Sequence, residues 1–374
     1  MKILIITGSF PPIKCGVGDY TNLLATHLAE NTSIEVTVLT SSSCKTDLKN
    51  VRVFPIINTW DMSSLSEIKR VVEEIRPDLI HIQYPTTGYE RYMTPSIIPL
   101  VLRLSGGYPI VQTWHEPLSK KGWIRYLPNA LVRSTLIFVE NGFMEKLPRF
   151  YHWLLRKNEK FHVSISSNIP KAILSEKEVK EIREKLVGID NVNKNTIAYF
   201  GFITPKKGIE QLIEASDPTK DNLILLCEFN VDNPYHVELK RYIEKSKWKE
   251  NIIVTGYLSD EKVANYLSVS DLAVFPFTEG STERNGSILA ARMQGTFVIT
   301  TSNNGEGLTH EGGVYLVPPN DEGKLSDAIS VHRRNSNKSD KSQVLSWSEV
   351  ANKHIEIYKK TIQKLTGGAN VKNV

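Results

Sequence analysis

The sequence predicts an α/β protein with two Rossmann-like domains, each a parallel sheet covered by helices on both faces. Three observations lead to this prediction. Short apolar runs rich in β-branched residues alternate with stretches of helical spacing, and this alternation lapses once and then resumes. The length of 374 residues is too great for one ordinary core but suits two. A hydrophobic share of 40% and a charged share of 23% are typical of a soluble globular protein.

The first half contains a series of short apolar runs, bounded by turn residues, that predict buried strands. They are Lys2–Thr7, Glu35–Leu39, Leu79–Ile82, Ile110–Thr113, Thr135–Val139 and Phe161–Ile165. Apolar positions at helical spacing predict helices at Tyr20–Glu30 and Leu65–Ile75 between them. We therefore expect a first domain over residues 1–165, with ligands bound beyond the carboxyl ends of its strands.

The alternation lapses over residues 166–195, where the charged run Glu176–Lys185 predicts one exposed helix within a linker. A second domain is expected over residues 196–344, with a last amphipathic helix over 345–366 and a disordered tail over 367–374. The strands predicted for this domain are Thr196–Phe200, Leu223–Cys227, Ile252–Thr255, Leu272–Phe275, Phe297–Thr301 and Val314–Val317.

Composition excludes several classes of protein. The net charge of +5 suits anionic ligands or an anionic membrane surface, but it is too weak to indicate nucleic acid. Cys15, Cys44 and Cys227 form no zinc or Cys-x-x-Cys spacing, which favours a reducing, cytoplasmic location. No apolar run reaches the roughly 18–20 residues that span a bilayer, and the run after Met1 is too short for a signal peptide. No aspartate cluster has metal-ligand spacing, so we expect no essential metal.

A loop with two glycines follows the first strand. Gly16 and Gly18 would let the backbone approach a ligand closely, and the N–H groups of a helix that starts near Asp19 suit a phosphate oxygen. The dinucleotide-binding fingerprint fits poorly, because Thr21 stands where a third glycine would be needed. A plain turn, with Asp19 complementing the helix dipole, explains the loop equally well, so both interpretations stay open.

His115 and Glu116 lie just beyond the strand Ile110–Thr113, where such a sheet displays functional side chains. A histidine there can hydrogen-bond a sugar hydroxyl or a phosphate, although a lone histidine is more often structural. His81 lies inside the preceding strand, and we expect it to have a core role.

Aromatic and basic side chains follow that preceding strand, Leu79–Ile82. Tyr84 comes at its end, and Tyr89 and Arg91 follow in the next loop. Because they follow the carboxyl end of a predicted strand, we expect these three side chains to line the acceptor side of the first domain.

Two segments of the second half indicate an anion site. Gly201 ends a strand, and Lys206 and Lys207 follow before a helix, where a lysine can act as a point-charge partner for a leaving phosphate. The second segment is a loop of small residues with one arginine before the helix Ile288–Gln294, which can combine backbone donors with a fixed charge. Solvated lysines and a solvated loop are the alternatives. The loop residues that we expect to contact a ligand are Glu279, Ser281, Glu283, Arg284, Asn285, Gly286 and Ser287.

Over nearly its whole length the chain resembles the retaining GT-B glycosyltransferases of family 4 (glycosyl transferases group 1). The resemblance rests on the order and spacing of Gly16–Tyr20, His81–Tyr84, Thr113–Glu116, Gly201–Gly208, Val254–Ser259 and Glu279–Thr301. It implies two Rossmann-like domains that face each other across a cleft. The first would bind the acceptor, the second would bind the nucleotide sugar, and the last helix would pack back on the first.

The resemblance also implies an activity and roles for single residues. The activity is transfer of a sugar from a nucleotide-diphosphate donor to a saccharide or lipid-linked acceptor, with retention of configuration, in polysaccharide or glycolipid biosynthesis. No cofactor and no protein nucleophile are needed. The residues with implied roles are Gly16, Gly18, Gly201 and Lys207 at the donor phosphates, Gly256 and Tyr257 near the base, His115 near the transferring sugar, and Asp19 and Glu116 on the acceptor side.

Two features depart from the family pattern. Phe202 stands where the family usually has an arginine, and Thr282 and Ala290 stand where it has a Glu-x7-Glu pair. The segment resembles a variant branch in which Arg284 and Ser287 supply the missing phosphate contacts, so that Arg284 joins His115 and Lys207 as a catalytic candidate. The alternatives are a non-catalytic homologue that binds nucleotide or a partner enzyme, and a nucleotide-sugar epimerase.

Basic residues are mixed with tryptophan and leucine in Ser119–Tyr126 and Arg149–Lys160. This mixture suits peripheral contact with an anionic membrane, and an ordinary solvated surface is the equal alternative. The expected partners are thus a nucleotide sugar and an acceptor. If the basic and aromatic residues do contact a membrane, its inner face is a third partner.

Overall fold

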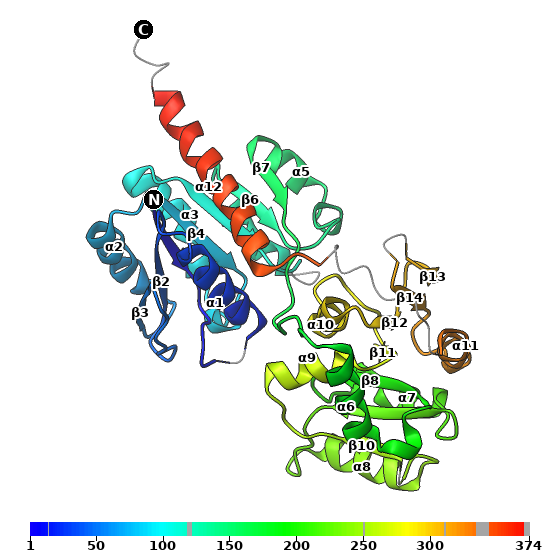
Figure 1. The fold of residues 1–374 in the computed structure, drawn as a ribbon. Coiled ribbons are helices and arrows are strands. Elements are labelled where there is room, and N and C mark those ends of the chain that lie inside the picture. Colours follow the sequence, from blue (N-terminus) through cyan, green and yellow to red (C-terminus); the bar gives the residue numbers. More distant parts are fainter. Residues whose placement is uncertain (14, 118–121, 250, 310–311, 334–343, 370–374) are drawn as a thin grey trace. The chain divides into compact units, whose positions relative to one another are not determined.

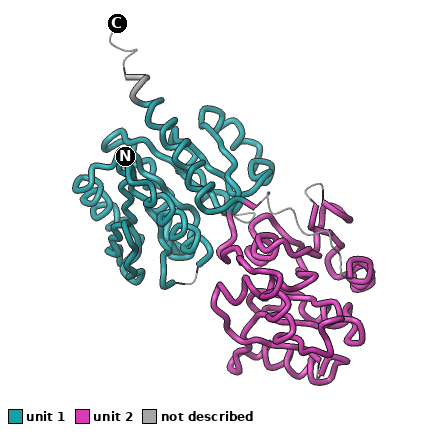
Figure 2. Tube along the Cα trace, in the orientation of Figure 1, with its two compact units in different colours: residues 1–165, 345–374 teal, residues 166–344 magenta. Residues whose placement is uncertain are grey.

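The computed structural model describes residues 1–13, 15–117, 122–249, 251–309, 312–333 and 344–369. The chain divides into two compact units (Figure 2). Unit 1 comprises Met1–Ile165 together with Leu345–Val374, and unit 2 comprises Ser166–Val344. The C-terminal segment therefore belongs to the same unit as the N-terminus.

Unit 1 contains, within the described residues, a sheet of seven parallel strands in the order β3-β2-β1-β4-β5-β6-β7 (Figure 1). The strands are β1 (Lys2–Ile6), β2 (Glu35–Ser41), β3 (Val51–Ile57), β4 (Leu79–Tyr84), β5 (Ile110–Trp114), β6 (Thr135–Phe138) and β7 (Glu159–His162). The helices are α1 (Gly16–Ala29), α2 (Ser64–Ile75), α3 (Thr94–Gly106), α4 (Leu127–Ala130), α5 (Phe150–Leu154) and α12 (Trp347–Ala369), with short 3₁₀ turns such as η4 (Leu155–Lys157).

Both faces of the unit 1 sheet are buried, as expected for parallel strands. Side chains alternate between the faces along β1: Leu4 and Ile6 pack into the core beneath α2 and α3, whereas Ile3 and Ile5 pack into the core beneath α1 and α12. Helix α12 lies against α1 on that second face. The last helix thus completes the core of unit 1.

Unit 2 repeats this architecture in the order β10-β9-β8-β11-β12-β14-β13, in which, among the described residues, only the β13–β14 pair is antiparallel. The strands are β8 (Asn195–Phe200), β9 (Asp221–Leu226), β10 (Ile252–Val254), β11 (Leu272–Phe275), β12 (Phe297–Thr301), β13 (Gly307–Leu308) and β14 (Val314–Val317). The helices are α6 (Glu176–Val187), α7 (Ile209–Ala215), α8 (Pro234–Lys245), α9 (Asp260–Ser268), α10 (Gly286–Gln294) and α11 (Glu322–His332), with the 3₁₀ turn η6 (Pro205–Lys207).

The prediction of a separate linker over residues 166–195 was wrong, because this stretch is part of unit 2. Helix α6 packs against α9, and the guanidinium of Arg183 makes two hydrogen bonds of 3.0 and 2.7 Å to the carboxylate of Asp271. The capping box at Ser175 fixes where the helix begins. These contacts tie the segment to the start of β11.

Some elements also differ from the sequence prediction. Strand β3 (Val51–Ile57) and the short β13 were not predicted, and β7 begins at Glu159 rather than at Phe161. Helix α12 continues to Ala369, so residues 367–369 of the predicted tail are helical. Residues 370–374 of that tail lie outside the described residues. In the part of the chain that is described, no helix is long and apolar enough to cross a membrane.

The strand order reverses direction at β1/β4 in unit 1 and at β8/β11 in unit 2. In open parallel sheets ligands bind at such switch points, beyond the carboxyl ends of the strands. Most of the predicted site residues follow β1, β4, β5, β8 or β11, so the topology brings each set to one edge of its own sheet.

Candidate functional site

The loop after β1 is held by the loop after β4. The hydroxyl of Ser9 accepts a hydrogen bond of 2.8 Å from the N–H of Gly88 and lies 3.1 Å from the hydroxyl of Thr87. A Cβ added at Gly88 would lie 1.8 Å from the carbonyl oxygen of Gly8, so the two loops touch through their backbones. No local sequence pattern indicates this pair of glycines, because only the adjacency of β1 and β4 brings Gly8 and Gly88 together.

The two glycines predicted to approach a ligand differ in their surroundings. A Cβ added at Gly16 would meet nothing within 4 Å, so the backbone is open there, at the first residue of α1. Gly18 is buried, and a Cβ there would come within 3.3 Å of the backbone of Ser9 and Phe10. Gly18 therefore has a packing role, and Gly16 is the open position. Asp19 lies half-buried in the first turn of α1.

His115 lies beyond the end of β5 and is 5% exposed. Its Nε2 is 2.7 Å from the side-chain oxygen of Gln83, which can only accept, so Nε2 carries the proton. The ring of Tyr20 packs edge-on against it, with ring centroids 4.8 Å apart. Gln83 in turn points its amide nitrogen at His81. The orientation of His115 is thus set by buried neighbours on α1 and β4.

Helix α12 completes this hydrogen-bonded group. The hydroxyl of Tyr358 lies 2.7 Å from Nδ1 of His81, whose Nε2 is 2.7 Å from the hydroxyl of Thr113. Nε2 of His354 is 3.1 Å from the hydroxyl of Tyr20. Burial lowers the pKa of His354 from 6.5 to about 4 and holds the pKa of His81 well below its usual range, so both rings are neutral at pH 7. The core role predicted for His81 agrees with these contacts.

The prediction that Tyr84 and Tyr89 face an acceptor was wrong. Each is 2% exposed. The hydroxyl of Tyr84 lies 2.9 Å from that of Ser96, and the hydroxyl of Tyr89 donates to the carbonyl of Ile6 at 3.4 Å. Their rings are instead part of the core beneath α2 and α3.

Besides the half-buried Asp19, two more residues predicted on the acceptor side are at the surface. Arg91 is exposed in the loop after β4. Glu116 has an exposed side chain, and its carbonyl accepts a hydrogen bond from the hydroxyl of Tyr126. These two remain candidates for contact with a ligand.

In unit 2, the turn after β8 and the loop after β11 come together. The N–H of Thr278 donates to the carbonyl of Lys206 at 3.1 Å, and a Cβ added at Gly208 would lie 2.1 Å from the carbonyl oxygen of Pro276. Gly208 has a φ of +65°, which favours glycine. The two segments predicted as an anion site therefore form one surface at the switch point.

Lys207 is half-buried on this surface, and its Nζ lies 4.4 Å from the ring centroid of Phe277. Partial burial lowers the pKa of the ammonium. Lys206 differs, because it is exposed and pairs with the carboxylate of Glu279 at 2.8 Å. Local patterns do not separate these lysines, and only the family resemblance selected Lys207; the structure agrees that Lys207 is the one that is oriented. Phe277, which orients it, was missed.

The loop before α10 has a defined shape. The side-chain oxygen of Asn285 accepts from the N–H of Thr282 at 2.6 Å, and both the N–H and the hydroxyl of Ser281 donate to the carbonyl of Thr301 at 2.8 Å. Asn285 and Ser281 thus shape the loop rather than point freely outward. Glu279 and Glu283 are exposed.

The first turn of α10 faces Gly201, in the turn that follows β8. The hydroxyl of Ser287 would lie 3.0 Å from a Cβ added at Gly201, and Gly201 has a φ of +142°. Arg284 is half-buried in the loop, and Gly286 is exposed at the start of the helix. Backbone N–H groups at a helix start, a hydroxyl, Arg284 and Lys207 are the components of an anion site.

Four further positions were singled out in this half. Gly256 and the 80% exposed Tyr257 follow β10, two strands from β8 and so about 10 Å along the same edge. Phe202 is 79% exposed, and Ala290 is fully buried in α10. Among the described residues, no group of three or more His, Cys, Asp or Glu side chains could hold a metal ion.

Comparison with known families finds two matches. Residues 15–150 match a family model described as Glycosyltransferase Family 4, and residues 194–333 match one described as Glycosyl transferases group 1. Together the matches cover more than half of the chain. The 2-deoxystreptamine N-acetyl-D-glucosaminyltransferase of Niallia circulans is 25% identical over 142 residues, which are 36% of this chain and 35% of that protein. The chain thus spans only about a third of that curated relative.

Solved structures match the chain over its whole length. A glycosyltransferase from Rickettsia africae has a TM-score of 0.72 at 15% identity, covering 97% of this chain and 98% of that one. The Anabaena protein HepE, in complex with UDP, has a TM-score of 0.66 at 16% identity, covering 100% and 99%. Identities this low show a shared fold, with two Rossmann-like domains.

Proposed function

The chain belongs to the GT-B glycosyltransferases, and from this premise we propose that it transfers a sugar from a nucleoside-diphosphate donor to a saccharide or lipid-linked saccharide. Unit 2 binds the donor and unit 1 binds the acceptor. The observation that carries the proposal is the single surface at the β8/β11 switch point. It combines Lys207, Arg284, Ser287 and the first turn of α10 next to Gly201.

Each part of this surface suits a leaving diphosphate. The α10 N–H groups and the Ser287 hydroxyl donate to phosphate oxygens, and Arg284 and Lys207 neutralise the negative charge that grows as the sugar leaves. Gly201 leaves room for the phosphates beside Ser287. Gly256 and Tyr257, about 10 Å along the edge, lie at a distance that a nucleotide spans, so we assign the base to them.

Retention follows from attack on the face from which the diphosphate departs. The bond between C1 and the phosphate oxygen breaks, a bond between C1 and the acceptor oxygen forms, and the acceptor proton passes to the leaving phosphate. His115 contacts the transferring sugar through the ring that Gln83 and Tyr20 orient. No metal and no protein nucleophile takes part in this route.

A transfer assay tests the proposal. The protein is incubated in chelator with a panel of nucleotide sugars and candidate acceptors, and the products are free diphosphate and a new glycoside. Proton NMR of the anomeric hydrogen reads the configuration. A glycoside with the donor's configuration is the expected result. Conversion of the donor alone to an isomer would identify an epimerase, and nucleotide binding without turnover would identify a non-catalytic homologue.

A second proposal concerns a membrane face on unit 1. Trp153 is 66% exposed and Ile124 is 52% exposed, and the guanidinium of Arg156 lies 4.4 Å from the ring of Trp153. Aromatic, aliphatic and basic groups together suit the interface of an anionic bilayer. Ser119, Lys120 and Lys121, also predicted here, lie outside the described residues. Co-sedimentation with anionic liposomes, and none with neutral ones, is expected, and equal negligible pelleting would remove the idea.

A further inference from the structure

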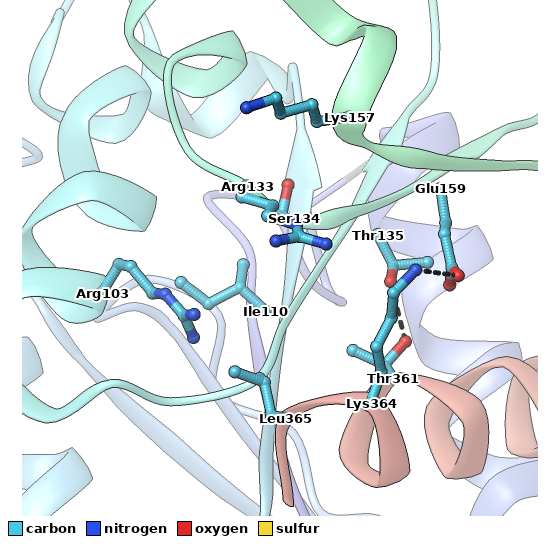
Figure 3. A pocket seen from close by; sticks show the side chains of 10 residues that line it. All are labelled: Arg103, Ile110, Arg133, Ser134, Thr135, Lys157, Glu159, Thr361, Lys364 and Leu365. Carbon is cyan, nitrogen blue, oxygen red and sulfur yellow. Dashed lines mark hydrogen bonds and ion pairs between the residues drawn. The ribbon is translucent and has the colours of Figure 1, made fainter. Parts of the chain in front are cut away.

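A basic pocket lies at the edge of the unit 1 sheet where β5, β6 and β7 begin. Its volume is about 110 Å³ (Figure 3). The lining residues are Arg103, Ile110, Arg133, Ser134, Thr135, Lys157, Glu159, Thr361, Lys364 and Leu365. They come from α3, three strands or the turns before them, η4 and the C-terminal part of α12, so elements far apart in the sequence assemble the pocket.

This edge is opposite the one that carries His115. Strand β5 begins at Ile110, in the pocket, and ends one residue before His115. Its five residues rise about 3.3 Å each, which separates the two places by roughly 16 Å. The pocket is therefore distinct from the candidate site, and the inference does not depend on the proposed activity.

The pocket carries an excess of positive charge. Its ionisable side chains are Arg103, Arg133, Lys157 and Lys364 against the single carboxylate of Glu159. That carboxylate is hydrogen-bonded to Lys364, as Figure 3 shows. The charges of the two arginines and Lys157 thus have no carboxylate among the lining residues to balance them.

The basic groups differ in what already holds them. One terminal nitrogen of Arg103 donates to the carbonyls of Gly107 and Tyr108 at 3.0 and 3.1 Å, which anchors the side chain and leaves its other donors for a ligand. Arg133 and Lys157 are exposed and have no hydrogen-bond or ion-pair partner within the described residues. Figure 3 shows Arg103 and Arg133 beside Ile110, with Lys157 farther from it.

We propose that this pocket binds a phosphate group, carried by a small anionic metabolite or by a lipid headgroup. Planar guanidinium groups match phosphate oxygens, and lysine adds a point charge. The cavity has room for several water molecules and hence for a phosphate. Bound phosphate bridges α3, η4 and the turn before β6. Lys364 of α12 joins the same pocket through its hydrogen bond to Glu159 of β7.

Hydrogen–deuterium exchange tests the site and locates it. The full chain is compared in phosphate and in chloride of equal ionic strength. Slower exchange at residues 130–136 and 156–161 of unit 1 is expected. In the double variant Arg133→Gln/Lys157→Gln, the same protection of these peptides should need about tenfold more phosphate. The matched control Lys49→Gln/Lys69→Gln removes two exposed charges elsewhere on unit 1 and should behave as wild type.

A second arm separates the two sources of phosphate. Wild type and the double variant are sedimented with phosphatidylcholine vesicles that contain or lack phosphatidic acid. Protection by free phosphate identifies a soluble ligand, and variant-sensitive binding to phosphatidic acid alone identifies a headgroup. Either result supports the pocket. The proposal is overturned if neither probe is sensitive to the double variant, or if Arg133→Gln/Lys157→Gln and the control lose binding equally.

Discussion

The carboxyl edges of the two sheets share one strand order and differ in burial and charge. In unit 1, His115 is 5% exposed and is surrounded by Tyr20, Gln83 and, behind them, the neutral rings of His81 and His354. In unit 2, the charged side chains that follow β8 and β11 are exposed or half-buried: Lys206 is exposed, and Lys207 and Arg284 are half-buried, near the glycine turns at Gly201 and Gly208.

On the proposed function, this difference would let one topology serve two kinds of ligand. A buried network that is fully hydrogen-bonded fixes the direction of a neutral group, which suits recognition of sugar hydroxyls. Cations at the surface, beside backbone donors, suit an anion that arrives from solvent. We therefore propose that unit 1 orients a sugar and unit 2 neutralises charge, and the following predictions test that division.

The largest effect is expected for Lys207→Ala. Loss of one preorganised charge at a leaving group costs about 10²–10³ in rate, and we expect kcat/KM to fall by that factor. Lys206→Ala is the matched control, because Lys206 is exposed and paired with Glu279, and it should change kcat/KM by less than about threefold. Equal losses in the two variants would contradict the assignment of Lys207.

A pH dependence is expected in unit 1. The unfolded chain protonates His354 near pH 6.5, whereas the folded protein keeps it neutral down to about pH 4, so stability is lost as the pH falls through this window. The expected loss between pH 7 and pH 5 is about 2 kcal/mol. Urea unfolding read by tryptophan fluorescence reports mainly on unit 1, which holds five of the six tryptophans. His354→Gln should lose this part of the dependence, and an unchanged pH dependence in the variant would rule the cause out.

Tyr358→Phe probes the support that α12 gives to the network. Removing the hydroxyl leaves the buried Nδ1 of His81 without its 2.7 Å partner, and we expect unit 1 to lose about 1–2 kcal/mol of unfolding free energy. Nucleotide binding by unit 2 should not change. The control is Tyr92→Phe at a surface position. A variant as stable as this control would show that α12 contributes packing alone.

The smallest effect is expected for Phe202→Arg. Phe202 is 79% exposed in the turn after β8, next to Gly201, so a long side chain fits there. The arginine adds an exposed charge, which is worth about 0.2–1 kcal/mol. Diphosphate affinity should rise by up to about fivefold. Phe202→Gln controls for the loss of the ring. Weaker binding by the arginine variant, or an equal gain with glutamine, would mean that this turn does not approach the phosphates.

Much of the fold could be predicted because parallel strands covered on both faces read as nearly continuous apolar runs, as in β1 and β11. The strand β3 was missed because its sequence, VRVFPII, mixes an arginine and a proline into the run and lies at the sheet edge. The segment before β8 was misjudged as a linker because its attachment depends on the long-range pair Arg183–Asp271, which no local pattern reveals.

The candidate site was predicted in outline and not in detail. Residues that follow strands could be placed at a sheet edge, which located His115, Lys207 and Arg284. Burial could not be predicted, so Tyr84 and Tyr89 were assigned to an acceptor although both lie in the core. The partners of His115 were also beyond local reasoning, because the network reaches through Tyr20 and His81 to α12, more than 200 residues away.

Calorimetric titration of UDP, GDP, ADP, dTDP and CMP, in chelator, tests the central claim that unit 2 binds a nucleoside diphosphate. One diphosphate is expected to bind without metal to wild type and to Tyr358→Phe alike, and at least tenfold more weakly to Lys207→Ala. Absence of binding by every nucleotide, or equal affinity of wild type and Lys207→Ala, would contradict it.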